Sequence, residues 1–169
     1  MGLQDAFFKL KLPFTSSKAK ETSARIQETI YFQALKTSME LAKQSGTFSE
    51  FKNSRYAQGK LQVHLAESTQ ELMPELHFDW DGLAKEIQQT GLRNSLLIAI
   101  APTATIASIV GSYESIEPQV SNFFKRETLS GEFLQVNRYL INDLKARALW
   151  NDSIKAKIIA RSEEHTSEL

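Results

Sequence analysis

The sequence predicts an α/β fold in which helices dominate and strands are few and short. A long stretch in the first third carries apolar residues at three- and four-residue spacing, which is typical of an amphipathic helix. Leu96–Ile100 is short and uniformly apolar, as expected of a strand buried on both faces. Pro102 ends this run and a helical pattern follows, so a strand, a turn and a helix succeed one another.

The first third of the chain predicts one long helix. Residues 6–14 are apolar and aromatic, and their periodicity leaves a short helix and an extended segment both open. Thr15, Ser16 and Ser17 are candidate N-caps for a helix that runs to about Gln44, with Gly46 as its stop. The apolar face of this helix is Ile26, Ile30, Tyr31, Ala34, Leu35, Met39 and Ala42.

The middle of the chain predicts a loop, a short extended piece and a second helix. Residues 46–59 are polar and rich in turn formers, and Leu61–Leu65 fits an extended segment. Asp79 or Asp81 can cap a helix over Leu83–Gln89.

The last third predicts three helices and one strand. A short helix over Thr103–Val110 follows the apolar run, and a strand is expected near Phe123–Glu127 after a turn. After a turn at Leu129–Gly131, a long helix is expected from about Glu132 to Ala148, and another begins at Asn151–Asp152.

Composition excludes several classes of site. Lys plus Arg and Asp plus Glu both total 20 in 169 residues, so the formal net charge is zero, and nothing indicates a nucleic-acid or membrane partner. The chain has no cysteine, which excludes disulfides and thiol catalysis within it. Because its three histidines lack metal-ligand spacing, we predict no metal site. The histidines are His64, His77 and His165.

The final nine residues, Arg161–Leu169, differ from the rest. They match the in-frame translation of a widely used sequencing-library adapter, and a polar native tail is the alternative. We therefore expect residues 161–169 to be non-native and residues 1–160 to form the domain, with a gene that continued past Ala160.

The segment with most chemical content is Pro102–Ile106. A helix N-terminus presents unpaired N–H groups and the positive end of the helix dipole, which suits an anion. Thr103, Ala104 and Thr105 are small enough to admit a phosphate to the backbone, and two of them carry hydroxyl donors. The spacing of these residues does not distinguish a phosphate-binding loop from a loop that only caps a helix.

Several segments, in colinear order over residues 1–160, resemble the large, catalytic subunit of the ribonucleotide reductase family. They are Met1–Phe7, Glu28–Tyr31, Gly91–Thr105, Glu114–Pro118, Leu129–Phe133 and Val136–Asn137.

The resemblance implies a piece of that family's ten-stranded α/β barrel. It also implies that Pro102, Thr103, Ala104, Thr105 and Ile106 form the loop that holds the diphosphate of a ribonucleotide through backbone amides and the helix behind it. The family often has Ser and Thr at the last two positions, so Ile106 removes one side-chain donor.

For the parent protein, the resemblance implies an oxidoreductase that reduces ribonucleoside diphosphates to 2′-deoxyribonucleotides for DNA synthesis in the cytoplasm. It implies a homodimer that pairs with a small subunit bearing a metal or radical cofactor, and ATP or dNTP effectors. The chain itself would carry no cofactor and no catalytic residue, and would be inactive alone because it has no thiol. The alternative is a non-catalytic binding or interaction module with an anion site at a helix N-terminus.

Other suggestive residues have simpler structural interpretations. Glu114 and Glu117 are three apart, but the neighbouring Pro118 favours a turn over acid–base chemistry. For Arg93 and Asn94, turn chemistry is favoured over a role in positioning the loop. The four tyrosines are not neighbours in sequence, and each is expected to be packed or to lie amphipathically at a surface. They are Tyr31, Tyr56, Tyr113 and Tyr139.

Overall fold

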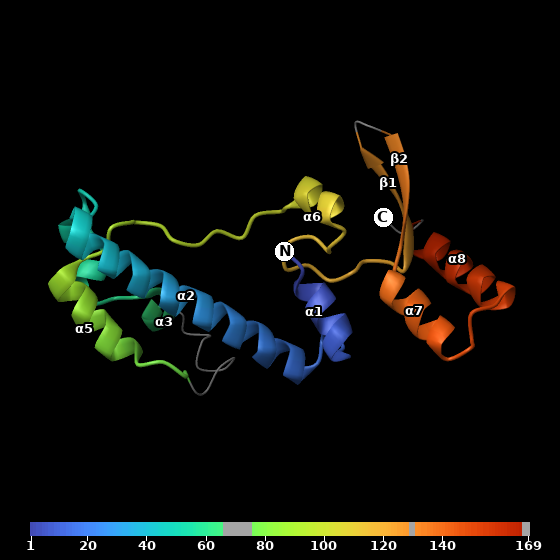
Figure 1. The fold of residues 1–169 in the computed structure, drawn as a ribbon, viewed down its shortest axis with the longest axis horizontal. Coiled ribbons are helices and arrows are strands. Elements are labelled where there is room, and N and C mark those ends of the chain that lie inside the picture. Colours follow the sequence, from blue (N-terminus) through green and yellow to red (C-terminus); the bar gives the residue numbers. More distant parts are fainter. Residues whose placement is uncertain (66–75, 129–130, 167–169) are drawn as a thin grey trace. The chain divides into compact units, whose positions relative to one another are not determined.

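The computed structural model describes residues 1–65, 76–128 and 131–166. The chain forms two compact units, coloured by sequence in Figure 1. The terminal unit comprises Met1–Phe8 and Ala104–Leu169, and the central unit comprises Lys9–Thr103. Among the described residues, none of the helices combines the length and the apolar character needed to cross a bilayer.

Helix α2 (Ser17–Ser45) confirms the predicted long helix at both ends. The hydroxyl of Ser16 accepts a hydrogen bond from the Ala19 amide at 3.1 Å, as an N-cap should. Gly46 follows with φ of 77°, and its amide donates to the Ala42 carbonyl at 2.9 Å.

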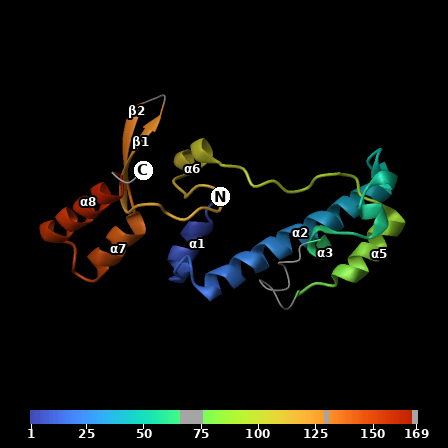
Figure 2. The ribbon, with the colours of Figure 1, turned by 180° about the vertical axis from the view of Figure 1, so that it is seen from behind.

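Helix α5 (Trp80–Thr90) lies alongside α2 in both views of the ribbon (Figures 1 and 2). Asp79 is its N-cap and accepts from the Gly82 amide at 2.8 Å, so the helix begins three residues before the predicted Leu83. Between the two helices lies the hydrophobic core of the central unit. Its buried members are Leu35, Met39, Phe51, Leu61, Trp80, Leu83, Ala84, Ile87 and Leu92.

In the described part of the segment between α2 and α5, the chain forms three short helical turns: η1 (Phe51–Asn53), η2 (Tyr56–Gln58) and α3 (Gln62–Leu65). The predicted extended piece at Leu61–Leu65 is therefore wrong. The Leu61 amide donates to Nδ1 of His64 at 3.3 Å, and this local bond to a side chain favours a turn over a strand.

The predicted apolar face of α2 is correct only in its C-terminal half. Leu35 and Met39 are buried, whereas Ile26 and Ile30 are exposed. Glu28 is buried in their place, because its carboxylate accepts hydrogen bonds from the Trp80 indole at 3.0 Å and from a backbone amide. A polar contact with α5 thus determines which side of the helix faces inward.

The predicted strand at Leu96–Ile100 is also wrong. The segment has no regular secondary structure, and Leu96 and Ile100 are 87% and 62% exposed. It is the long unwound trace between α5 and α6 in Figure 1. A buried strand needs partners on both edges, and within the described ranges the sheet contains only two strands, both far along the chain.

The terminal unit contains α1 (Leu3–Leu10), α6 (Ala104–Val110), α7 (Arg138–Ala146) and α8 (Asp152–Thr166). For residues 6–14, the sequence left a short helix and an extended segment both open, and the structure shows a helix as far as Leu10. Strands β1 (Phe123–Thr128) and β2 (Gly131–Val136) pair antiparallel, with Phe123 opposite Val136. The predicted strand and the predicted last helix are confirmed.

The predicted helix over Glu132–Ala148 is wrong in its first part, which forms β2. The reason is Asn137, whose Oδ1 accepts the amides of Tyr139 and Leu140 at 3.1 and 3.2 Å. This N-cap starts α7 at Arg138 and separates it from the strand. The turn predicted around Leu129 and Ser130 lies outside the described residues.

Candidate phosphate-binding loop

The predicted loop occupies the start of α6. Pro102 and Thr103 precede the helix, and Ala104, Thr105 and Ile106 form its first turn. Thr105 and Ile106 are exposed, and Ile106 retains 56% of its accessible surface. The first amides of a helix have no intrahelical acceptor, so this turn presents N–H groups on an exposed surface.

Thr103 has an unusual backbone. Its φ is 56°, in the left-handed region, which a β-branched residue rarely adopts. Such conformations cost about 1–3 kcal/mol and cluster at sites where function fixes the backbone. Lys11, Ser115 and Ala148 also have positive φ, so the conformation of Thr103 is local strain at the start of α6 that does not by itself identify a site.

Ala107 anchors the inner face of α6, and it is fully buried. At the other end, Gly111 has φ of 67°, and the Ser112 amide donates to the Ala107 carbonyl at 3.0 Å. This is a Schellman closure, in which glycine supplies the left-handed residue. The Schellman closure therefore ends the short helix at Gly111.

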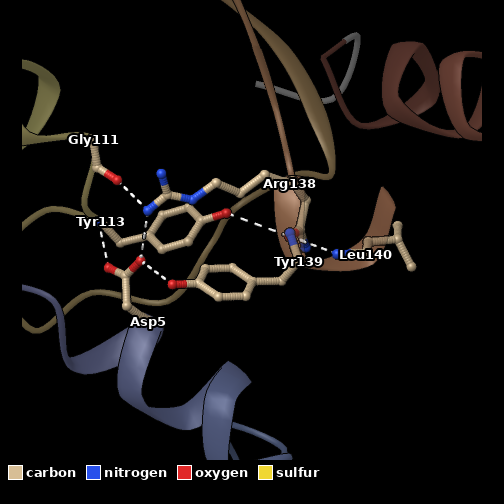
Figure 3. A network of polar contacts seen from close by, with 7 residues as sticks. Asp5, Gly111, Tyr113, Arg138, Tyr139 and Leu140 are labelled. Atoms are coloured by element: carbon tan, nitrogen blue, oxygen red, sulfur yellow. Dashed lines mark hydrogen bonds and ion pairs between the residues drawn. The ribbon is translucent and has the colours of Figure 1, made fainter. Parts of the chain in front are cut away.

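A polar cluster centred on Asp5 lies beside that end (Figure 3). The Asp5 carboxylate accepts hydrogen bonds from the Tyr113 amide at 2.7 Å and the Tyr139 hydroxyl at 2.8 Å. Nη2 of Arg138 lies 3.3 Å from Asp5 Oδ1 and also donates to the Gly111 carbonyl. Helix α1 and the start of α7 thus meet at the residues that follow α6.

Aromatic rings enclose the Asp5 cluster. Phe8 stacks on Tyr139 with ring centroids 5.1 Å apart and contacts Tyr113 at 5.6 Å. Burial, assisted by the nearby negative charge of Asp5, raises the pKa of Tyr113 to about 12. Burial and the hydrogen bond to Asp5 likewise raise the pKa of Tyr139. Both phenols are therefore neutral hydrogen-bonding groups at neutral pH.

Sequence reasoning missed the Asp5 cluster. It predicted that Tyr113 and Tyr139 are packed or lie amphipathically at a surface, which agrees with their partly buried rings, but it gave Asp5 and Arg138 no role. The contacts of Asp5 with Arg138 and Tyr139 span 133 and 134 residues, and no spacing rule reaches that far. A lone aspartate among apolar neighbours in a short N-terminal segment was the only available signal.

The other candidate residues have structural roles. The Glu117 amide donates to the Glu114 carbonyl at 3.2 Å, which confirms the turn. Asn94 exchanges hydrogen bonds with the buried hydroxyl of Ser38, and the Arg93 amide donates to the Ser38 carbonyl at 3.0 Å. These bonds join the start of the unwound segment to α2. In the described part of the chain, no group of three or more acidic or histidine side chains is placed to hold a metal ion.

Comparison with known proteins gives a consistent result over the whole chain. The sequence model described as "Ribonucleotide reductase, barrel domain" matches residues 1–169. Among curated relatives, the ribonucleoside-diphosphate reductase large subunit of Caenorhabditis elegans is 44% identical over 161 residues, which is 95% of this chain and 20% of the relative. The large subunit of Trypanosoma brucei brucei is 43% identical over 168 residues, covering 94% of this chain and 20% of the relative.

The likeness extends to fungi and viruses. The large chain of Schizosaccharomyces pombe is 44% identical over 158 residues, covering 94% of this chain and 19% of the relative. The large subunit of Vaccinia virus is 44% identical over 159 residues, or 94% of this chain and 20% of the relative. The chain thus spans about a fifth of the length of the relatives it matches.

Proposed function

Because this chain belongs to the ribonucleotide reductase barrel-domain family, we propose that it is a segment of the large subunit of a ribonucleoside-diphosphate reductase. The observation that carries the proposal is the match over nearly the entire chain at 42–44% identity to large subunits from animals, protists, fungi and viruses. The mixed content of helices and short strands in the described residues is consistent with a piece of an α/β barrel.

The parent would reduce ribonucleoside diphosphates to 2′-deoxyribonucleotides. Its large subunits would pair with each other and with a small subunit that supplies the radical, under control by effector nucleotides. Reduction at the ribose needs thiols, and this chain has none. We therefore propose that the chain contributes substrate binding, and that thiol chemistry belongs to the remainder of the subunit.

The proposed binding element is the loop Pro102–Ile106. The unpaired amides of the first turn of α6 and the positive end of its dipole would hold the diphosphate. The left-handed backbone of Thr103 supports this assignment, because strain in an exposed loop is commonly retained for function. Thr105 would add a hydroxyl donor, and Ile106 would contribute its backbone amide only.

Sequencing the source DNA across both ends of this reading frame tests the assignment to a large subunit. We expect an extension that encodes an Asn-x-Cys-x-Glu motif upstream and a Tyr-Tyr pair downstream. The same experiment tests the proposal that residues 161–169 are adapter-encoded, because the native codons would then diverge after Ala160. A native start at Met1 and a native stop near Ala160 would instead favour a free-standing binding module.

Charge substitution tests the loop in the full-length subunit. Ile106→Glu places a negative charge beside the first turn of α6, so the dissociation constant for a ribonucleoside diphosphate should rise at least about tenfold (roughly 1.4 kcal/mol). The neutral variant Ile106→Gln should bind within about twofold of the unaltered protein. Equal affinities of the Glu and Gln variants would refute a phosphate site here.

Ile106→Thr tests the side-chain contribution. It restores the hydroxyl that the family often has at this position. A gain of about tenfold or more in diphosphate affinity is expected if side-chain donation supplements the backbone amides, since one hydrogen bond to a charged group contributes about 1.5–3 kcal/mol. An unchanged affinity would assign the binding to the amides alone.

A further inference from the structure

We propose that Asp5 is a positioning residue that fixes the orientation of α6 and thereby aims the amides of its first turn, Ala104–Ile106, at the substrate's diphosphate. The inference rests on the proposed phosphate-binding function of the loop Pro102–Ile106. It assigns a role to a residue that is nearly a hundred positions away from the loop in sequence.

Asp5 is well placed to hold several segments at once. Its side chain is only 13% exposed, and its two oxygens serve different partners. Oδ2 accepts the Tyr113 amide, and Oδ1 accepts the Tyr139 hydroxyl and faces the Arg138 guanidinium. A second bond, from the Gly2 amide to the Tyr113 carbonyl at 3.0 Å, holds the same two chain segments together.

Arg138 links Asp5 to α6 itself. Nη2, which contacts Asp5, also donates to the carbonyl of Gly111, the residue that closes the helix. A Cβ atom built on Gly111 would lie 3.3 Å from Nη1 of Arg138, so the guanidinium rests directly against this backbone. Asp5, Arg138 and Gly111 therefore form one continuous polar chain from α1 to the end of α6 (Figure 3).

The helix can transmit this placement because it is short. Its seven residues span about 10 Å at a rise of about 1.5 Å each. With Ala107 buried and the C-terminal end held, little freedom remains for the first turn. A change in the hold at Gly111 would therefore alter the direction of the amides of Ala104, Thr105 and Ile106.

A purely stabilising role explains the cluster less well. Arg138 is 55% exposed although Asp5 is only 13% exposed, so solvent reaches one side of this ion pair and reduces its contribution to folding stability. The cluster is expected to affect the orientation of α6 more than its stability, because charge-assisted hydrogen bonds fix geometry as well as contributing energy. Its main effect is therefore expected on ligand binding.

The test uses the full-length subunit and two ligands, a ribonucleoside diphosphate and the same ribonucleoside without phosphates. For Asp5→Asn we expect about a tenfold higher dissociation constant for the diphosphate and an unchanged one for the ribonucleoside. In steady state, KM should rise by a similar factor and kcat should change less. Arg138→Met should behave like Asp5→Asn, and Arg138→Lys should recover part of the affinity.

Tyr139→Phe and Tyr113→Phe form a matched pair. Each removes one hydroxyl from the same aromatic cluster, but only the Tyr139 hydroxyl contacts Asp5; that of Tyr113 lies 3.5 Å from Asn137 Oδ1. We expect several-fold weaker diphosphate binding for Tyr139→Phe and no change for Tyr113→Phe. These variants also serve if Asp5→Asn does not fold.

The outcomes separate the two proposals. If Ile106→Glu weakens diphosphate binding while the Asp5, Arg138 and Tyr139 variants do not, the positioning role is refuted and the loop stands. If those variants weaken binding of both ligands equally, their role is structural only and the inference also fails. If Ile106→Glu does not change the dissociation constant for the diphosphate, the proposed function is refuted, and the inference that rests on it is refuted as well.

Discussion

At the scale of single residues, Asn137 separates two kinds of secondary structure. Its Oδ1 accepts the first two free amides of α7, and its Nδ2 donates to Asn122 Oδ1 at 2.9 Å. The side chain is buried, so neither contact can be replaced by water without rearrangement. It therefore both starts the helix and ties it to the base of the hairpin.

Asn137→Ala is expected to lower the free energy of unfolding by about 1–2 kcal/mol, because it removes an N-cap and leaves buried amides unpaired. Urea denaturation followed by circular dichroism measures the loss. Asn137→Asp keeps the acceptor for both amides and should cost less. A larger loss in the Asp variant would show that the bond to Asn122 matters more than the cap.

Tyr113 predicts a loss of stability in alkali. Its pKa rises from 10.0 to about 12 on folding, so its contribution is fully present below pH 10 and is lost as pH rises through 12. Tyr139 shifts in the same direction, whereas the positive charge of Arg138 opposes the shift of Tyr113. Unfolding midpoints measured from pH 9 to 12 should fall steeply above pH 10.

Tyr113→Phe should flatten part of that decline, and Tyr139→Phe should remove a further part. The tyrosinate absorbance of the native chain should reach half its full change for Tyr113 near pH 12. If Tyr113→Phe leaves the pH dependence of the midpoint unchanged, another group controls it.

Caps were the residue-level features that the sequence predicted well. Ser16, Gly46 and Asp79 act within four residues of themselves, so local chemistry was sufficient to find them. Glu28 and Asp5 were missed for the opposite reason, because their partners lie 49 or more residues away.

At the scale of elements, the end of α7 lacks the residue that its geometry prefers. Ala148 has φ of 57°, its amide donates to the Lys145 carbonyl, and the Leu149 amide donates to the Leu144 carbonyl. This is a Schellman closure with alanine in the left-handed position where glycine is usual. The same geometry carries glycine at the end of α6.

Ala148→Gly should therefore raise the free energy of unfolding by about 0.5–1 kcal/mol, since it relieves the left-handed conformation. Gly111→Ala, its mirror at the end of α6, should lower it by a similar amount or more. Thermal melts of both variants test the pair. A destabilising Ala148→Gly would mean that the entropy lost by glycine outweighs the relieved strain.

Elements with strong local signals were predicted correctly, namely α2, α5, α6, β1 and α8. The segments Gly131–Val136 and Leu96–Ile100 were not. In the first, apolar positions at helical spacing were divided between a strand and a helix by Asn137. In the second, the apolar composition indicates burial, but burial depends on partners that a sequence pattern alone does not supply.

At the scale of the whole molecule, several large apolar side chains among the described residues are exposed, in a chain that spans about a fifth of the length of its relatives. Leu96, Ile100, Ile109 and Val120 are each more than half exposed. Surfaces of this kind normally lie inside an interface or a core. We expect the rest of the subunit to cover them.

The isolated chain should therefore self-associate. Leu96→Glu combined with Ile100→Glu should reduce association, as seen by sedimentation velocity, without lowering the free energy of unfolding. Gln33→Glu combined with Gln44→Glu adds the same two charges on exposed polar sites and keeps the apolar surface. If this control reduces association equally, net charge rather than apolar contact is the cause.

The terminal unit is built from both ends of the chain, and this affects the order in which it can fold during synthesis. Residues 1–8 complete their contacts only after Tyr139 has been made, 134 positions after Asp5. At about 5–20 residues per second, translation leaves α1 without its full set of contacts for roughly 7–27 s. The central unit is continuous in sequence and can form during that interval. Within this stretch of chain, α1 is thus made before the central unit, but its contacts are completed later.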